Sequence, residues 1–66
     1  MVGNYVTAFK EWQPLAKQGH ASAQAQLGFM YAYGKGVRQD AAEAVKWYRK
    51  AAEQGDPHAQ FILGSM

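Results

Sequence analysis

The feature that most constrains this chain is an internal repeat, because the sequence matches itself when it is shifted by 36 residues. Repetition at a period of this size is the sequence signature of stacked supersecondary units. Most of the matches are small residues of the kind that set contacts between helices. The identical pairs are Ala8 and Ala44, Lys10 and Lys46, Ala16 and Ala52, Gln18 and Gln54, Gly19 and Gly55, Ala23 and Ala59, Gln24 and Gln60, Leu27 and Leu63, Gly28 and Gly64, and Met30 and Met66.

Each unit is predicted to form two helices, because apolar residues recur at spacings of three and four. The first helix of each unit has such a face, formed by Tyr5, Ala8, Phe9, Trp12 and Ala16 in one copy and by Ala41, Ala44, Val45, Tyr48, Ala51 and Ala52 in the other. The second helices carry Ala23, Leu27, Met30 and Tyr31, or Ala59, Leu63 and Met66. The pattern predicts helices over residues 4–18, 21–33, 40–54 and 57–66.

Several residues are typical of helix ends. We expect Asn4 and Asp40 to be N-caps, and Glu43, three residues after Asp40, completes the pattern of a capping box. Gly19 and Gly55 follow the apolar faces at the point where a helix C-terminus needs a left-handed residue. The sequence Asp56-Pro57 then supplies an N-cap and a proline at the first helical position.

Glycine and proline inside the predicted helices indicate close contacts and a bend. Gly28 and Gly64 recur at the repeat period, which predicts that a neighbouring helix comes too close to admit a Cβ atom. Pro14 cannot donate a hydrogen bond to the Lys10 carbonyl and predicts a kink. Residues 34–37, Gly-Lys-Gly-Val, form a turn-rich connector whose valine is expected to fold back onto the core.

The predicted fold is therefore an all-α, α/α-repeat solenoid of two helix-turn-helix units in one domain over residues 1–66. Repeat 1 covers about 4–39, and a truncated repeat 2 covers about 40–66. The apolar fraction is 48%, with three Phe, two Trp and four Tyr, which argues against disorder. A chain of 66 residues buries a smaller share of its surface than larger domains do, so contact with a partner or a second copy would add stability.

Composition excludes several function classes. The formal charge of +2 comes from interspersed signs and is too small to indicate nucleic acid. The chain has no cysteine for a disulfide or a thiolate metal site. No apolar run approaches the roughly 18 residues of a spanning helix, and the first residues do not form a signal peptide. We expect a water-soluble chain with no membrane contact.

Three sharper alternatives compete with an interaction role. A catalytic or metal site would have to use cap-region residues without a recognised spacing, namely Ser22, His20, His58, Asp40, Glu43 and Asp56. A phosphate-binding loop at residues 34–36 would need a preceding strand and a helix start directly after it. Helical repeats that read single-stranded RNA need a recurring basic or polar pair, and Glu11 and Glu53 interrupt the face on which Lys10 and Lys46 recur. We therefore predict no enzymatic activity and no cofactor.

The residues also resemble the Sel-one-like repeats, which are relatives of the tetratricopeptide repeat with a slightly longer unit. The resemblance covers nearly the whole chain and rests on Ala23-Gln24, Leu27-Gly28, Met30-Tyr31, Gly34-x-Gly36-Val37, Asp40, Ala44, Trp47-Tyr48, Ala51-Ala52 and Gln54-Gly55. It implies a right-handed superhelix that serves as an adaptor in protein complexes. Many such chains are bacterial and exported, which is compatible with a periplasmic or secreted precursor, although the sequence fixes no location. Both ends of the chain resemble cuts through a longer array.

We predict that the function is protein–protein interaction, with a purely structural, self-assembling repeat as the alternative. The partner's identity is open. In solenoids one helix of each pair lines the inner face, so the expected partner surface is the exposed side of the two first helices: Lys10, Glu11, Lys46, Trp47, Arg49 and Lys50. For Trp12, Trp47 and Tyr48 we favour packing in the core between helices, with partial exposure as the alternative for Trp47 because it is equivalent to Glu11. Uncovered apolar residues at both ends predict self-association, either by end-to-end stacking or by exchange of a helix pair through residues 34–36, and we favour a symmetric homodimer.

Overall fold

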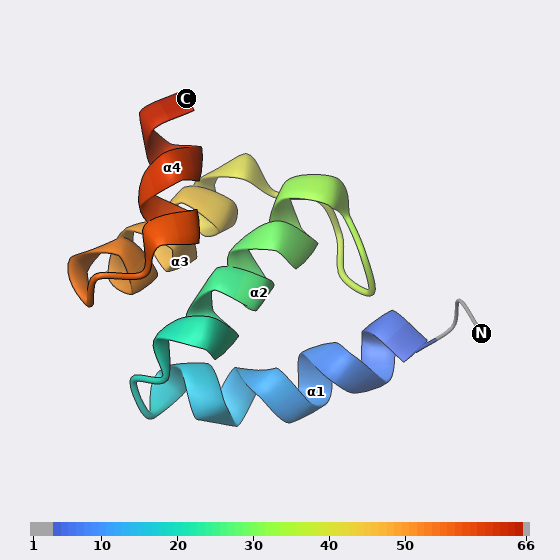
Figure 1. Cartoon of the computed structure of the whole chain (residues 1–66). Helices are drawn as coiled ribbons and strands as arrows, with labels where there is room; N and C mark the ends of the chain where they lie inside the picture. Colours follow the sequence, from blue (N-terminus) through green and yellow to red (C-terminus); the bar gives the residue numbers. More distant parts are fainter. Residues whose placement is uncertain (1–3, 66) are drawn as a thin grey trace.

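The computed structural model describes residues 4–65, which contain four α-helices joined by short connectors (Figure 1). They are α1 (Asn4–Lys17), α2 (Ala21–Tyr33), α3 (Ala41–Glu53) and α4 (Pro57–Ser65). The predicted all-α fold is confirmed. The predicted helix bounds agree to within one residue, and Met66, the predicted end of the last helix, lies outside the described residues.

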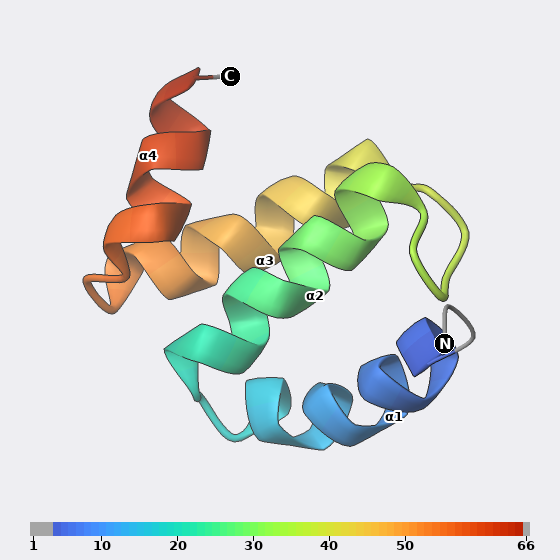
Figure 2. The ribbon, with the colours of Figure 1, turned by 45° about the vertical axis from the view of Figure 1, so that its right-hand side comes forward.

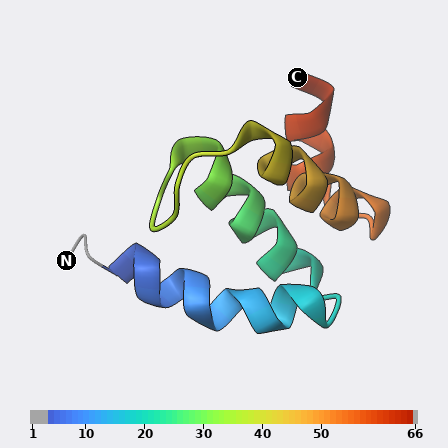
Figure 3. The same ribbon diagram turned by 180° about the vertical axis from the view of Figure 1, so that it is seen from behind.

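Each helix packs on the next one along the chain, α1 on α2, α2 on α3 and α3 on α4. As a result, α1 and α4 lie on opposite sides of the central α2–α3 pair (Figure 2). From behind, the connector after α2 forms a long loop beside the start of α1 before the chain enters α3 (Figure 3). This is the arrangement of two successive helix-turn-helix units.

The core consists of two clusters, each formed by three consecutive helices. The first joins α1, α2 and α3 and contains Ala16, Ala23, Leu27, Met30 and Trp47, with Phe9, Trp12 and Val37 packed against it. The second joins α2, α3 and α4 and contains Ala25, Ala44, Tyr48, Ala51 and Ala59. Both clusters draw on α2 and α3, so these two helices hold the fold together. The predicted core positions of Trp12, Tyr48 and Val37 are confirmed.

The turns inside the two units have the same hydrogen bonds, one period apart. Gly19 and Gly55 have φ angles of 100° and 93°, and their N–H groups donate to Ala16 and Ala52 at 3.0 and 2.9 Å. The next residues, His20 and Asp56, donate to carbonyls five positions back at 3.2 and 3.1 Å. These two bonds define a Schellman motif, in which the left-handed residue is usually glycine. The prediction made for the two glycines is confirmed.

The helix starts differ more than the helix ends. Asp40 accepts a hydrogen bond from the Glu43 N–H at 3.2 Å, and Asp56 Oδ1 accepts from the N–H groups of His58 and Ala59 at 2.9 and 3.2 Å. The capping box is only half formed, because the Asp40 N–H donates to the Tyr31 carbonyl instead. Asn4 is the first residue of α1 and not the residue before it, so its predicted capping role is wrong.

The two recurring glycines have different surroundings. A Cβ atom at Gly28 would lie 2.9 Å from Cγ and Cδ1 of Tyr48, so the close contact predicted there is confirmed. At Gly64 a Cβ atom would meet nothing within 4 Å among the described residues, so the same expectation is wrong for α4. The reason is that α3 covers α2, whereas no described helix covers the equivalent face of α4. At Pro14, α1 continues without interruption to Lys17.

Glutamine side chains tie the units together. Gln24 Nε2 donates to the Ala16 carbonyl at 3.0 Å, and Gln60 Nε2 makes the equivalent bond to Ala52, also at 3.0 Å. Between the units, Gln54 Nε2 donates to Gln24 Oε1 at 2.8 Å. Because Gln24 is buried, these bonds satisfy polar atoms that would otherwise cost free energy. The same side chain therefore fixes one unit internally and joins it to the next.

Candidate partner-binding surface

One face of α3 presents a stripe of residues at helical spacing that borders an open hollow of about 350 Å³. All of these residues come from α3, and we call them the α3 stripe: Ala42, Val45, Lys46, Arg49, Lys50 and Glu53. The spacings of three and four place them on one side of the helix. The opposite side of α3 carries the buried Ala44, Tyr48 and Ala51. Amphipathic patterning of α3 therefore fixes both its core contacts and its exposed stripe.

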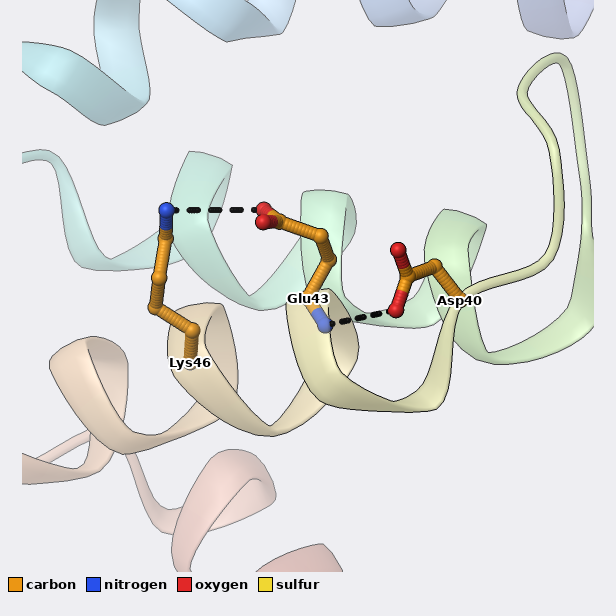
Figure 4. Close-up of polar contacts among 3 residues, drawn as sticks. All are labelled: Asp40, Glu43 and Lys46. Carbon is orange, nitrogen blue, oxygen red and sulfur yellow. Dashed lines mark hydrogen bonds and ion pairs between the residues drawn. The ribbon is translucent and has the colours of Figure 1, made fainter.

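The stripe is mainly basic, with three cations and one carboxylate around two small apolar side chains. Lys46 is the cation with local partners: its Nζ lies 3.5 Å from Glu43 Oε1 (Figure 4). The same Nζ lies 5.6 Å from the centre of the Trp47 ring. The Lys46 side chain is still 54% exposed, and an exposed ion pair contributes only about 0–1 kcal/mol. Within residues 4–65, Arg49 and Lys50 have no carboxylate within ion-pair distance. The positive charges of Arg49 and Lys50 are therefore available to pair with acidic groups of a partner.

The structure gathers only half of the predicted partner surface. Lys46, Arg49 and Lys50 lie together on the stripe, whereas Lys10 and Glu11 are exposed on α1 and do not line the hollow. The α1 and α3 helices each pack on α2 and do not form a helix pair with each other. The residues predicted on α1 and those predicted on α3 therefore form two separate areas of the surface.

The prediction that Trp47 is part of the exposed surface is wrong. Its side chain is 8% exposed and packs in the first core cluster with Leu27 and Met30. The physical reason is that α3 packs on the unit before it, so Trp47 lies in a cluster with residues of α1 and α2, whereas among the described helices α1 packs on α2. At the equivalent position of α1 stands Glu11, which is exposed. Trp47 still contacts the stripe, because the Lys46 ammonium group lies over the face of its ring in a cation–π contact.

Sequence reasoning missed three members of the stripe, Ala42, Val45 and Glu53. The signal that could have found them is the helical spacing from Lys46 and Arg49, because positions three and four residues away share a face. Their chemistry matters: Ala42 and Val45 give the hollow an apolar floor, and Glu53 places one negative charge at the end of the stripe.

Other chemistry is sparse in the described part of the molecule. His20 and His58 are both exposed near helix starts, and the His, Asp and Glu side chains of residues 4–65 form no group of three that could hold a metal ion. Burial raises the pKa of Tyr31, with further contributions from the charges of Glu43 and Asp40, and burial likewise raises the pKa of Tyr48. None of the helices between residues 4 and 65 has the length and apolar character needed to cross a membrane.

The family model described as Sel1 repeat matches residues 21–56, which contain α2, the connector, α3 and the turn after it. The chain belongs to the Sel1 repeat family. The matched span contains the whole α3 stripe as well as the contact between Gly28 and Tyr48. The resemblance inferred from the sequence is therefore confirmed, and the candidate surface lies within the matched repeat.

Curated relatives of this Sel1 repeat come from animals, plants and bacteria. The chain is 49% identical over 63 residues to protein sel-1 homolog 2 of Homo sapiens, a match that covers 96% of this chain and 9% of the relative. It is 35% identical over 52 residues to the ERAD-associated E3 ubiquitin-protein ligase component HRD3A of Arabidopsis thaliana, with 77% and 8% covered. An uncharacterized protein of Neisseria meningitidis is 42% identical over 65 residues, with 91% and 14% covered. The chain therefore spans a small part of each relative's length.

Proposed function

We propose that this Sel1 repeat is a protein-interaction module that binds an acidic segment of a partner through the α3 stripe and catalyses no reaction itself. The observation that carries the proposal is the grouping of Lys46, Arg49 and Lys50 around one hollow. An acidic segment would meet three cations and a single carboxylate there. Its small apolar side chains could lie on Ala42 and Val45.

The exposure of the stripe indicates the kind of binding to expect. Exposed ion pairs each contribute about 0–1 kcal/mol. Salt weakens them further, because the Debye screening length is about 10 Å at 0.1 M ionic strength. Binding through this surface should therefore be weak, fast and sensitive to salt. Higher affinity would require contacts outside the stripe, and Lys10 on α1 is a predicted candidate because it holds the position equivalent to Lys46 one period earlier.

The relatives support an interaction role. The Arabidopsis relative is named as a component of a ubiquitin-protein ligase, so a chain that contains such repeats takes part in a multi-protein assembly. Repeat proteins of this kind offer extended surfaces on which a partner lies across several units. The α3 stripe would be one unit's share of such a surface.

The experiment measures the binding of a fluorescent glutamate-rich peptide by anisotropy at low and high salt. Arg49→Glu combined with Lys50→Glu should weaken binding about tenfold or more, since it reverses two charges of the stripe. The matched control is Lys35→Glu combined with Arg38→Glu, which makes the same change of net charge in the exposed connector and should leave binding nearly unchanged. Equal losses in both double variants, or preferential binding of single-stranded RNA, would overturn the proposal.

We also propose that copies of the chain self-associate, as the sequence predicts. Support comes from large apolar side chains that remain exposed near both ends of the described chain, with Phe61 74% and Val6 49% exposed. The symmetric homodimer formed by exchange through residues 34–36 stays a prediction.

A further inference from the structure

Three cations of the α3 stripe occupy closely spaced positions on one helical face. Arg49 and Lys50 follow Lys46 by three and four residues. Residues at these spacings are neighbours on a helix surface, with Cβ atoms about 5–6 Å apart. All three side chains are exposed and line the same hollow. Lys46, Arg49 and Lys50 therefore form a compact group of positive charge, which we call the cation triangle.

The stability of α3 does not explain this grouping. Like charges at these spacings destabilise a helix. A cation near a helix C-terminus is favoured by the helix dipole, but of the three only Lys50 lies in the last turn of α3. Glu43 pairs with Lys46 at 3.5 Å, whereas within residues 4–65 Arg49 and Lys50 have no carboxylate at ion-pair distance (Figure 4). The cation triangle therefore keeps an excess of positive charge that an anionic ligand would offset.

A following unit leaves the face of the cation triangle open. The equivalent positions of α1 are Lys10, Gln13 and Pro14, and α1 is followed along the chain by α3 and α4. Lys10 and Pro14 are nevertheless exposed, and Gln13 is half-buried. Other residues of α1 pack in the first core cluster, namely Ala8, Phe9, Trp12 and Ala16. The cation triangle thus lies on a side of its helix that the packing of successive units does not use.

A phosphoryl group matches the cation triangle better than a carboxylate does. A phosphoserine carries about −1.5 to −2 charges at pH 7 and three strong acceptor oxygens, so one group can pair with three donors. The guanidinium of Arg49 donates two parallel hydrogen bonds to such a group, whereas the ammonium groups of Lys46 and Lys50 act as point charges. A glutamate carries one charge and two acceptor oxygens, which leaves part of the positive charge unpaired.

We propose that the acidic segment bound by the α3 stripe contains a phosphorylated serine or threonine whose phosphoryl group lies in the cation triangle. This inference rests on the proposed function and names the class of partner. Ala42 and Val45 continue the stripe toward the start of α3, so the residue of the partner on that side is expected to be small and apolar. Glu53 continues the stripe toward the end of α3 and disfavours an acidic residue on the other side.

A protein segment fits this site better than a free phosphate ion. The hollow is open and its cations are exposed, so water and salt weaken each charge contact. A free ion would have only these contacts. A segment adds contacts with Ala42 and Val45, and the phosphate then fixes its position along the stripe.

The test compares three fluorescent peptides that differ at one position, which is serine, phosphoserine or glutamate, by anisotropy. The parent chain should bind the phosphoserine peptide about tenfold or more tightly than the glutamate peptide, and the serine peptide most weakly. Arg49→Lys keeps the charge but removes the paired donors, so the preference for phosphoserine over glutamate should fall to about threefold or less. The matched control is Arg38→Lys, which makes the same change in the exposed connector and should keep the preference.

The outcomes separate this inference from the proposed function. Equal binding of the phosphoserine and glutamate peptides would overturn the inference and leave the proposed function standing, whereas no binding of any peptide would overturn both. The inference is also wrong if Arg49→Lys keeps the full preference, if Arg38→Lys loses as much, or if inorganic phosphate at the peptide's own concentration displaces the phosphopeptide. Helical circular dichroism of both variants checks that a changed preference is not loss of folding.

Discussion

Replacement of Gly28 by leucine tests the packing between the two units. The ring of Tyr48 is 1% exposed and lies 2.9 Å from the position that a Cβ atom would take, so neither the ring nor the new side chain has free space to move into. The matched control is Gly64→Leu, because Gly64 holds the equivalent position of α4 with nothing within 4 Å. The two variants make the same chemical change in different surroundings.

Two effects of opposite sign set the size of the change. Replacing a helical glycine by a better helix former stabilises by about 1 kcal/mol. Forcing extra carbon atoms into a filled contact costs about 1–3 kcal/mol and occasionally more. At Gly28 a whole leucine side chain must enter, so the cost should be at the upper end and the net loss about 1–2 kcal/mol or more. At Gly64 only the favourable effect operates, reduced by the nearby helix end.

Thermal denaturation followed by helical circular dichroism measures both variants. For a domain of 60–100 residues a loss of 1 kcal/mol corresponds to about 4–8 °C in the melting temperature, which is readily resolved. We expect Gly28→Leu to be clearly less stable than the parent and Gly64→Leu to be equal or more stable. If Gly28→Leu proved more stable than the parent, or if both variants changed by the same amount, the close-packing explanation for the recurring glycine would be wrong.

Three further predictions concern a turn, a cap and pH. Gly55→Val should destabilise by about 1–2 kcal/mol, because φ is 93° there and a β-branched residue is strained in that conformation even with open space around it; an unchanged melting temperature would contradict this. His20→Asp should stabilise by about 0.5–1 kcal/mol, because the His20 side chain makes no capping bond whereas Asp56 accepts two at the equivalent position; a lower urea midpoint would refute it. Burial raises the pKa of Tyr48 above its ordinary 10.0, so the folded state holds the phenol proton more tightly than the unfolded state does. This contribution to the free energy of unfolding is present below pH 10 and is lost as the pH rises beyond it, so Tyr48→Phe should show a smaller fall in urea midpoint between about pH 8 and about pH 11 than the parent. An equal fall in both proteins would contradict the raised pKa.

Much of the fold could be predicted because the repeat makes each local signal appear twice. The left-handed glycines at 19 and 55, the caps at Asp40 and Asp56 and the packing of Gly28 all follow from residue types whose backbone or steric requirements are local. Each of these signals in one unit has a counterpart at the equivalent position of the other. That redundancy is why the helix bounds agree so closely.

The repeat was misleading where the two copies have different neighbours. Trp47 is buried although its counterpart Glu11 is exposed, because α3 packs on the preceding unit of α1 and α2, whereas within residues 4–65 no preceding unit covers α1. Gly64 is open although Gly28 is covered, because no described helix covers the equivalent face of α4. The stripe itself was half predicted: charge identified Lys46, Arg49 and Lys50, but the apolar floor of Ala42 and Val45 follows only from the face that α3 leaves exposed. Such differences depend on tertiary position, which a repeat pattern does not encode.

Amide chemical shifts of the ¹⁵N-labelled chain, followed while a glutamate-rich peptide is added, test most directly the claim that the α3 stripe is the partner-binding surface. The account predicts shift changes concentrated at residues 42–53, lost in the Arg49→Glu, Lys50→Glu variant and reduced by salt. Changes centred on the connector residues Lys35 and Arg38, or spread evenly over all basic residues, would contradict it.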